Sequence, residues 1–174
     1  MPLAEHRHWD CQALRAAPGA LAVPGAEADL PALGAREILG LYRLASISQP
    51  RADVGRLYAI DVGHEFPFHS TRLPSRLEGR EAIMDWSSAG WEARVLSHER
   101  YRSLSVNDTS DPGTIVDEQE VIGTSRATGD FALPSIVVLT VAHGQITRFR
   151  DWVNIPAAVA ALGRVKLSRQ AAMC

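Results

Sequence analysis

The fold of this chain is decided by residues 136–154, Ile136-Val-Val-Leu-Thr-Val-Ala-His-Gly-Gln-Ile-Thr-Arg-Phe-Arg-Asp-Trp-Val-Asn154. Two apolar runs flank a tight turn at His143-Gly144, which predicts a β-hairpin. Counting outward from a two-residue loop predicts three cross-strand pairs: Val141 with Ile146, Val138 with Phe149, and Ile136 with Asp151.

Alternation along the second strand of this hairpin separates two faces. One face carries Phe149, Asp151 and Val153, and the other carries Arg148, Arg150 and Trp152. A carboxylate among apolar neighbours has lost much of its water, so it persists with a partner, a raised pKa or a chemical role. Asp151 is therefore the first candidate for a catalytic acid or base.

The composition predicts one globular domain, because 174 residues with 46% hydrophobic and 22% charged side chains can bury a proper core. A net charge of −2 gives no basic field, so we expect no nucleic-acid partner. No apolar run reaches membrane-spanning length and no export signal opens the chain, which predicts a cytoplasmic protein without a membrane partner. Two cysteines, Cys11 and Cys174, argue against a disulfide framework. We also expect no metal, nucleotide or flavin, because phosphate loops and ligand clusters are missing from the sequence.

The chain divides into three segments. Residues 1–33 are rich in Ala, Pro and Gly, and we interpret them as a flexible arm in which His6 and His8 are solvated. Residues 34–163 form the expected domain, and residues 164–174 form a basic tail.

Helical spacing is predicted over 35–47, after Pro50, over 79–88 and over 157–162. Strands are predicted at 62–68, 95–106, 113–122, 131–142 and 146–153. Helices at the front followed by antiparallel strands indicate an α+β fold, a half-cone of curved, mostly antiparallel sheet wrapped around three N-terminal helices. Such a half-cone encloses an internal apolar cavity, where a small-molecule site is expected.

Several side chains should join Asp151 at this cavity. His64, on the inward face of residues 62–68, shares a proton with Asp151, orients a substrate carbonyl, or is structural. Tyr42, on the first helix, either donates a hydrogen bond to an oxyanion or belongs to the core. The side chains expected to bind substrate are Phe66, Phe68, Trp86, Trp91, Glu118, Glu120, Ile136, Val138, Phe149 and Val153. For the two glutamates the alternative is a solvated or dimer-facing row, and for the two tryptophans it is ordinary core packing.

Four motifs resemble the SnoaL-like polyketide cyclase branch of the nuclear-transport-factor-2-like, ketosteroid-isomerase-like superfamily. They are Phe66-Pro-Phe68, Leu77-Glu-Gly-Arg-Glu-Ala-Ile83, Asp111-Pro112, and residues 143–154 followed by Ala160-Ala-Leu-Gly163. The likeness covers residues 35–163, and it implies the half-cone fold and a homodimer formed through the outer face of the sheet. The fold hosts isomerases, polyketide cyclases, epoxide hydrolases, dehydratases and binding modules, so it cannot by itself choose a reaction.

Matching to ketosteroid isomerases places Tyr42 at their helix tyrosine. Phe66 stands where their mobile-proton aspartate would be, and Val137 or Val138 stands at their second acid. The resemblance therefore does not imply steroid-type isomerisation with that set of residues.

Matching to limonene-epoxide-hydrolase-like members places Asp151 and Glu120 at their two carboxylates. Glu118 stands at the place of the arginine between them, so that cation is missing. Phenazine-biosynthesis proteins also carry an acidic residue at the Asp151 position, where it is thought to donate a proton.

From these matches we expect a cofactor-free cyclase or isomerase of natural-product biosynthesis, such as antibiotic biosynthesis, acting on a small hydrophobic intermediate of polyketide type. Asp151, assisted by His64 or Tyr42, would move a proton, while confinement in the cavity favours ring closure, including a pericyclic one. Two alternatives stay open, an epoxide hydrolase or epoxide-opening cyclase and a non-catalytic dimeric module that binds small hydrophobic molecules.

Overall fold

The computed structural model describes residues 33–69, 73–93 and 95–163. The expected tail and all but the last residue of the expected arm lie outside this range. So do His6, His8, Cys11 and Cys174.

A six-stranded sheet organises the molecule, in the order β2-β1-β6-β5-β4-β3. Its strands are β1 (Tyr58–Glu65), β2 (Arg76–Glu78), β3 (Leu96–Asp108), β4 (Thr114–Ser125), β5 (Gly129–Ala142) and β6 (Gln145–Val153). All neighbours pair antiparallel except β1 and β6, which pair in parallel. The predicted α+β fold with a curved, mostly antiparallel sheet is confirmed.

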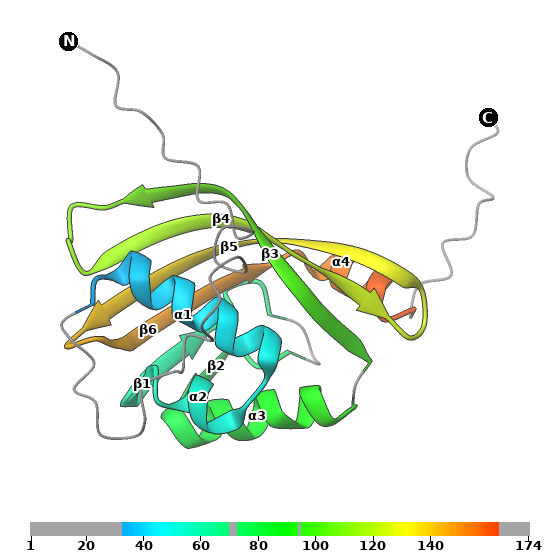
Figure 1. Cartoon of the computed structure of the whole chain (residues 1–174), viewed down its shortest axis with the longest axis horizontal. Coiled ribbons are helices and arrows are strands. Elements are labelled where there is room, and N and C mark those ends of the chain that lie inside the picture. Colours follow the sequence, from blue (N-terminus) through cyan, green and yellow to red (C-terminus); the bar gives the residue numbers. More distant parts are fainter. Residues whose placement is uncertain (1–32, 70–72, 94, 164–174) are drawn as a thin grey trace, which may run out of the picture.

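Four helices accompany the sheet: α1 (Ala35–Ser48), α2 (Arg51–Gly55), α3 (Arg80–Ala93) and α4 (Ile155–Ala161). Figure 1 shows α1 crossing one face of the sheet, with α2 and α3 on the same side. Helix α4 lies beside the N-terminal part of β5. Gln49, which caps α1, has a left-handed φ of 59°, and Pro50 then prevents the helix from continuing. We call the helix-covered face of the sheet the inner face and the opposite face the outer face.

The hairpin of β5 and β6 has the predicted two-residue turn, with positive φ at His143 and Gly144. Val141 pairs with Ile146 as expected, but the register then shifts, because β6 contains one more residue, Thr147, than the strand opposite it. Beyond this bulge Phe149 pairs with Leu139 and Asp151 pairs with Val137.

The predicted pairs of Phe149 with Val138 and of Asp151 with Ile136 are therefore wrong. A shift of one residue moves a strand's side chains to the opposite face. Ile136 and Val138 consequently lie on the outer face. Val137 and Leu139 occupy the inner-face positions that were expected for Ile136 and Val138.

Strand β1 ends earlier than predicted, at Glu65, with Phe66 following directly and a turn at Pro67. Proline has no N–H to donate to a neighbouring strand, which favours this end. His64 and Phe66 are buried as expected, at 5% and 3% exposure. The inward placement of Phe68 is wrong, since the turn leaves its ring 64% exposed.

The main core lies between α1 and the inner face. It contains Ile38 and Leu39 of α1, Leu139 of β5, and Ile146 and Phe149 of β6. Burial of such side chains contributes roughly 1.5–3 kcal/mol each and fixes α1 against the sheet. None of the described helices is both long and apolar enough to span a membrane.

Candidate functional site

Asp151 lies on the inner face, two residues beyond Phe149 along β6. Val137 is its direct neighbour across the strands, and Phe149 is almost fully buried. The Oδ1 atom of Asp151 is buried and has no hydrogen-bond partner among the described residues, although the residue as a whole is partly exposed. Burial raises the pKa of its carboxyl to about 7, because the charged form has lost water without gaining a cation.

His64 lies on the same face, because it pairs with Phe149 across the parallel strands β1 and β6. Its imidazole packs between two rings, with centroid distances of 4.6 Å to Phe66 and 4.6 Å to Phe149. Both ring nitrogens are buried and have no hydrogen-bond partner among the described residues. Burial lowers its pKa to about 3, so the imidazole is neutral at ordinary pH.

Three tyrosines surround this part of the inner face. Tyr42 of α1 lies 5.1 Å from Phe149 and 6.0 Å from Tyr58 between ring centroids. Burial raises the pKa values of Tyr42, Tyr58 and Tyr101, and in each case the charge of Asp151 adds to the effect. All three hydroxyls therefore remain protonated, and they lie near enough to Asp151 to feel its charge.

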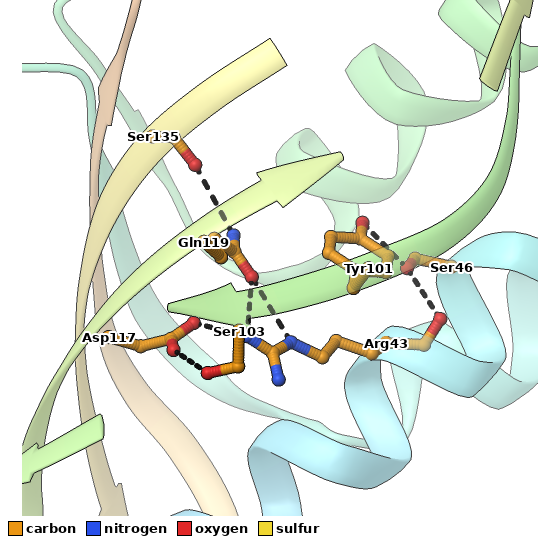
Figure 2. Close-up of polar contacts among 7 residues, drawn as sticks. All are labelled: Arg43, Ser46, Tyr101, Ser103, Asp117, Gln119 and Ser135. Atoms are coloured by element: carbon orange, nitrogen blue, oxygen red, sulfur yellow. Dashed lines mark hydrogen bonds and ion pairs between the residues drawn. The ribbon is translucent and has the colours of Figure 1, made fainter. Parts of the chain in front are cut away.

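The inner face holds a second acid that sequence reasoning missed, Asp117. Its carboxyl is 0% exposed and accepts hydrogen bonds from Arg43 of α1 and from Ser103 of β3, the latter at 2.9 Å. Arg43 also donates to the Oε1 atom of Gln119 from Nε at 3.1 Å and from Nη2 at 2.9 Å. Gln119 in turn donates to Ser135 at 3.3 Å, and Figure 2 shows the arginine reaching from α1 to both β4 side chains.

Asp117 belongs to the same cross-strand row as Asp151, since each pairs directly with Val137. Burial raises the pKa of Asp117, and the ion pair with Arg43 opposes this rise. The sequence of β4 has apolar residues at both parities, Ile115 and Val121 on one and Val116 and Ile122 on the other. Only the register against β5 shows that the first set, which includes Asp117, faces inward.

The expectation that Glu118 and Glu120 bind substrate at the inner face is wrong. Both lie on the outer face, opposite in parity to Asp117 and Gln119. Glu120 accepts a hydrogen bond from Arg102 at 2.7 Å. Glu118 is exposed, whereas the side chain of Glu120 is only 16% exposed, so the outer-face row that the sequence left open as the alternative is solvated at Glu118 alone.

The other predicted substrate-binding side chains are spread more widely. Val153 follows Asp151 on the inner face, and Phe66 lies 5.3 Å from Trp86 between ring centroids. Trp86 is 42% exposed, whereas Trp91 packs against the main core. Ile136, Val138 and Phe68 do not contribute to the inner face.

Described residues line a hollow of about 440 Å³ beyond the C-terminal ends of α1 and α3. Its walls come from Gln49, Trp91, Leu96, Ser97, Thr124, Ser125 and Arg126. The apolar cavity expected around Asp151 stays a prediction. Within the described ranges no three His, Cys, Asp or Glu side chains gather as metal ligands would.

These groups together define an inner face with one acid that lacks a donor at a buried oxygen, Asp151, a second acid paired with Arg43, Asp117, and several neutral hydroxyls. An acid with a pKa near working pH can both give and take a proton. Neutral tyrosines in an apolar setting can donate hydrogen bonds to an oxygen that gains charge. This set of groups suits proton transfer at a carbon beside a carbonyl.

No protein-family model matches the sequence. No curated protein matches it in sequence. Solved structures do resemble it. A presumed isomerase from Bacillus subtilis aligns with 75% of this chain and 94% of its own at 23% identity, with a TM-score of 0.69.

Two further similar structures are named for other activities. The M. tuberculosis epoxide hydrolase described as LEH-like covers 75% of this chain and 90% of its own at 15% identity, with a TM-score of 0.59. A presumed polyketide cyclase from Xanthomonas campestris pv. campestris covers 74% of this chain and 96% of its own at 19% identity, with a TM-score of 0.56. At such low identities the likeness establishes the fold, which is the ketosteroid-isomerase-like fold. The resemblance that the sequence motifs indicated is thereby confirmed at the level of the fold.

Proposed function

We propose that this protein is a cofactor-free enzyme, an isomerase or cyclase, in which Asp151 transfers a proton to or from a small apolar substrate. One observation carries the proposal. The carboxyl of Asp151 stands on the inner face with a buried oxygen that has no hydrogen-bond partner among the described residues, and its pKa is about 7. A structural carboxylate would have a donor at that oxygen, as Asp117 has at both of its oxygens.

In the proposed reaction the carboxylate form of Asp151 removes a proton from the carbon next to a substrate carbonyl, and the enolate oxygen gains negative charge. The hydroxyl of Tyr42 hydrogen-bonds with Tyr58 in the free protein and stays protonated because its pKa is raised; in the proposed reaction it donates instead to the enolate oxygen. Protonated Asp151 then delivers the proton to another carbon, which completes an isomerisation. If the enolate first attacks a second carbonyl of the same molecule, a ring closes instead.

His64 serves this reaction as part of the apolar wall in our proposal. Its pKa of about 3 makes it a poor proton acceptor, and its ring packs between Phe66 and Phe149. Such a wall excludes water from Asp151 and thereby maintains the raised pKa. The substrate class, an intermediate of polyketide type, is proposed from the sequence resemblance and from the name of the Xanthomonas structure.

The proposal is tested with a simple apolar ketone, 2-tetralone, whose α-protons exchange with deuterium when a base removes them. Proton NMR in deuterated buffer measures this exchange with the wild type and with Asp151→Asn. We expect the enzyme-catalysed exchange to rise with pH through the pKa of Asp151 and to disappear in the variant. Asp61→Asn, which changes an exposed carboxylate of β1, is the matched control and should exchange at the wild-type rate.

Circular dichroism of Asp151→Asn confirms that the variant folds. Exchange at the full wild-type rate by this variant would contradict the proposed role of Asp151. Saturable binding of 2-tetralone by both proteins without catalysed exchange in either would support a binding module instead.

A second candidate function, opening of an epoxide by water, is favoured by the position of Asp117. A second inner-face acid lies in the same cross-strand row as Asp151, and Arg43 supplies from α1 the cation that the strand sequence lacks. Two carboxyl groups that flank a water molecule can activate it and protonate the leaving oxygen. Incubation with limonene oxide in ¹⁸O-labelled water should then give a labelled diol, and Asp117→Asn should abolish it. An unlabelled or absent diol argues against this candidate.

A further inference from the structure

Ser135 of β5 has a hydroxyl whose hydrogen has no acceptor among the described residues. Its oxygen accepts a hydrogen bond from the Nε2 atom of Gln119 at 3.3 Å. The direction of this bond is fixed, because the Oε1 atom of Gln119 accepts two hydrogen bonds from Arg43 and a guanidinium has only donors. The amide nitrogen of Gln119 therefore faces Ser135, as Figure 2 shows, and the hydroxyl of Ser135 is left to donate elsewhere.

Ser135 lies close to Asp151 on the inner face. It pairs with Val153, the inner-face residue that follows Asp151 on β6, so Ser135 and Asp151 are diagonal neighbours. The Cα atoms of such neighbours are about 7–8 Å apart, a distance that one small molecule can span. Tyr42 packs against Phe149, the inner-face residue that precedes Asp151. Asp151 thus stands between two hydroxyl donors along β6.

Open space reaches the hydroxyl of Ser135. A hollow of about 850 Å³ at the end of β6 is lined in part by three inner-face side chains, Gln119, Ser135 and Val153, and by the start of α4. Ser135 and Val153 are both partly exposed. A hydroxyl that only supports the fold normally donates to a nearby acceptor. The hydroxyl of Ser135 is oriented by a buried arginine and has open space before it, which suits it to bind a ligand.

We propose that Ser135 binds a second oxygen of the substrate, and that Gln119 and Arg43 are positioning residues that orient its hydroxyl. This inference rests on the proposed function of Asp151. It narrows the substrate to molecules with acceptor oxygens on both sides of the carbon that loses the proton. Tyr42 binds the enolate oxygen on one side of that carbon, and Ser135 binds the other oxygen. A ketone with a single oxygen leaves Ser135 without an acceptor and should therefore bind less tightly.

Three planar phenols that imitate an enolate test this assignment. The ligand 2-naphthol has one oxygen, whereas naphthalene-1,3-diol and naphthalene-2,7-diol have a second oxygen at a shorter and a longer distance. Isothermal titration calorimetry measures their affinities for the full chain. We expect at least one diol to bind the wild type about fivefold or more tightly than 2-naphthol. Ser135→Ala should reduce this ratio to near one, and Ser135→Thr, which keeps a hydroxyl, should restore most of it.

Gln119→Glu tests the orientation of the hydroxyl while Ser135 itself is unchanged. The new carboxylate has an acceptor where the amide nitrogen was, so the hydrogen of Ser135 turns toward it and is lost to the ligand. The preference for the diol should then fall as it does in Ser135→Ala. A purely structural role of Gln119 would weaken all three ligands alike and leave the ratio of their affinities unchanged.

Ser97→Ala changes an exposed strand serine that lines the other hollow, and this matched control should keep the wild-type ratio. Circular dichroism verifies the fold of every variant. Equal affinity of the wild type for all three ligands overturns the role of Ser135, and so does the absence of measurable binding. A folded Ser135→Ala that keeps the preference also overturns it, as does loss of the preference in Ser97→Ala. Exchange of 2-tetralone that depends on Asp151 would in each case still support the proposed function, so the two failures are distinguishable.

Discussion

Asp151 shows how the surroundings of one side chain set its chemistry. The carboxyl shares the inner face with Phe149, Val137 and Val153, and none of these can donate a hydrogen bond from its side chain. Asp117, one strand beyond Val137, is more deeply buried and yet has two donors. The two acids differ in their partners, and only Asp151 is left with an unbonded buried oxygen.

Replacement of Asp151 by Asn should stabilise the protein above neutral pH. The folded-state pKa of about 7 exceeds the ordinary aspartate value of 3.8, so the folded state keeps its proton while the unfolded state loses it as pH rises between these values. Stability due to Asp151 is therefore present at low pH and lost on the way to pH 7. We expect the variant to gain about 2–4 kcal/mol in free energy of unfolding at about pH 8 and much less at about pH 4.

Urea denaturation across this pH range measures the gain. An equal gain at both ends of the range would show that Asp151 titrates normally in the folded state.

Replacement of His64 by Phe should act in the opposite pH range. The folded-state pKa of about 3 lies below the ordinary value of 6.5, so only the unfolded state binds a proton as pH falls through 6.5. Stability due to the neutral imidazole is present above this pH and lost below it. The difference in free energy of unfolding between variant and wild type should therefore be about 1–2 kcal/mol more favourable to the variant at about pH 5 than at about pH 8.

Thermal or urea unfolding at the two pH values checks this prediction. A difference between variant and wild type that does not change with pH would mean that His64 is protonated alike in the folded and unfolded states.

At the scale of elements, helix α1 is joined to strand β4 by a buried ion pair. The side chain of Arg43 is 12% exposed and that of Asp117 is 0% exposed. Burying both charges costs desolvation energy that their attraction offsets only while both partners are present. The pair therefore specifies how α1 lies on the sheet more than it stabilises the fold.

Asp117→Ala should accordingly destabilise the protein by about 3–5 kcal/mol, because it leaves the guanidinium of Arg43 buried without its carboxylate. The double variant Arg43→Met/Asp117→Leu should recover most of this loss, since two apolar side chains need no partner. Urea denaturation of wild type, single and double variants gives the comparison. A double variant as unstable as Asp117→Ala would show that the ion pair itself contributes most of the stability.

Strand β6 explains why the site was only partly predictable from the sequence. Alternation alone correctly grouped Phe149, Asp151 and Val153, because it depends on one strand. Which residues of β5 face inward depends on the bulge at Thr147, and no feature of the local sequence indicates an extra residue there. The placements of Ile136 and Val138 failed for this reason.

At the scale of the whole molecule, the order of helices and strands could be predicted from the sequence because apolar residues recur at regular spacing in each long element. The three-residue strand β2 is too short to leave such a signal. The parallel pairing of β1 with β6, which sets His64 beside Phe149, joins segments far apart in the chain. Asp117 was missed because both faces of β4 have apolar residues, so only tertiary pairing identifies the inner one.

The engagement of both oxygens of Asp117, by Arg43 and by Ser103, has a stereochemical consequence for the proposed isomerisation. Asp151 is left as the carboxyl that both abstracts and redelivers hydrogen, and it stands on one side of any substrate held against the sheet. The transfer should then be suprafacial, and a deuterium label placed at the abstracted position should reappear in part within the same product molecule.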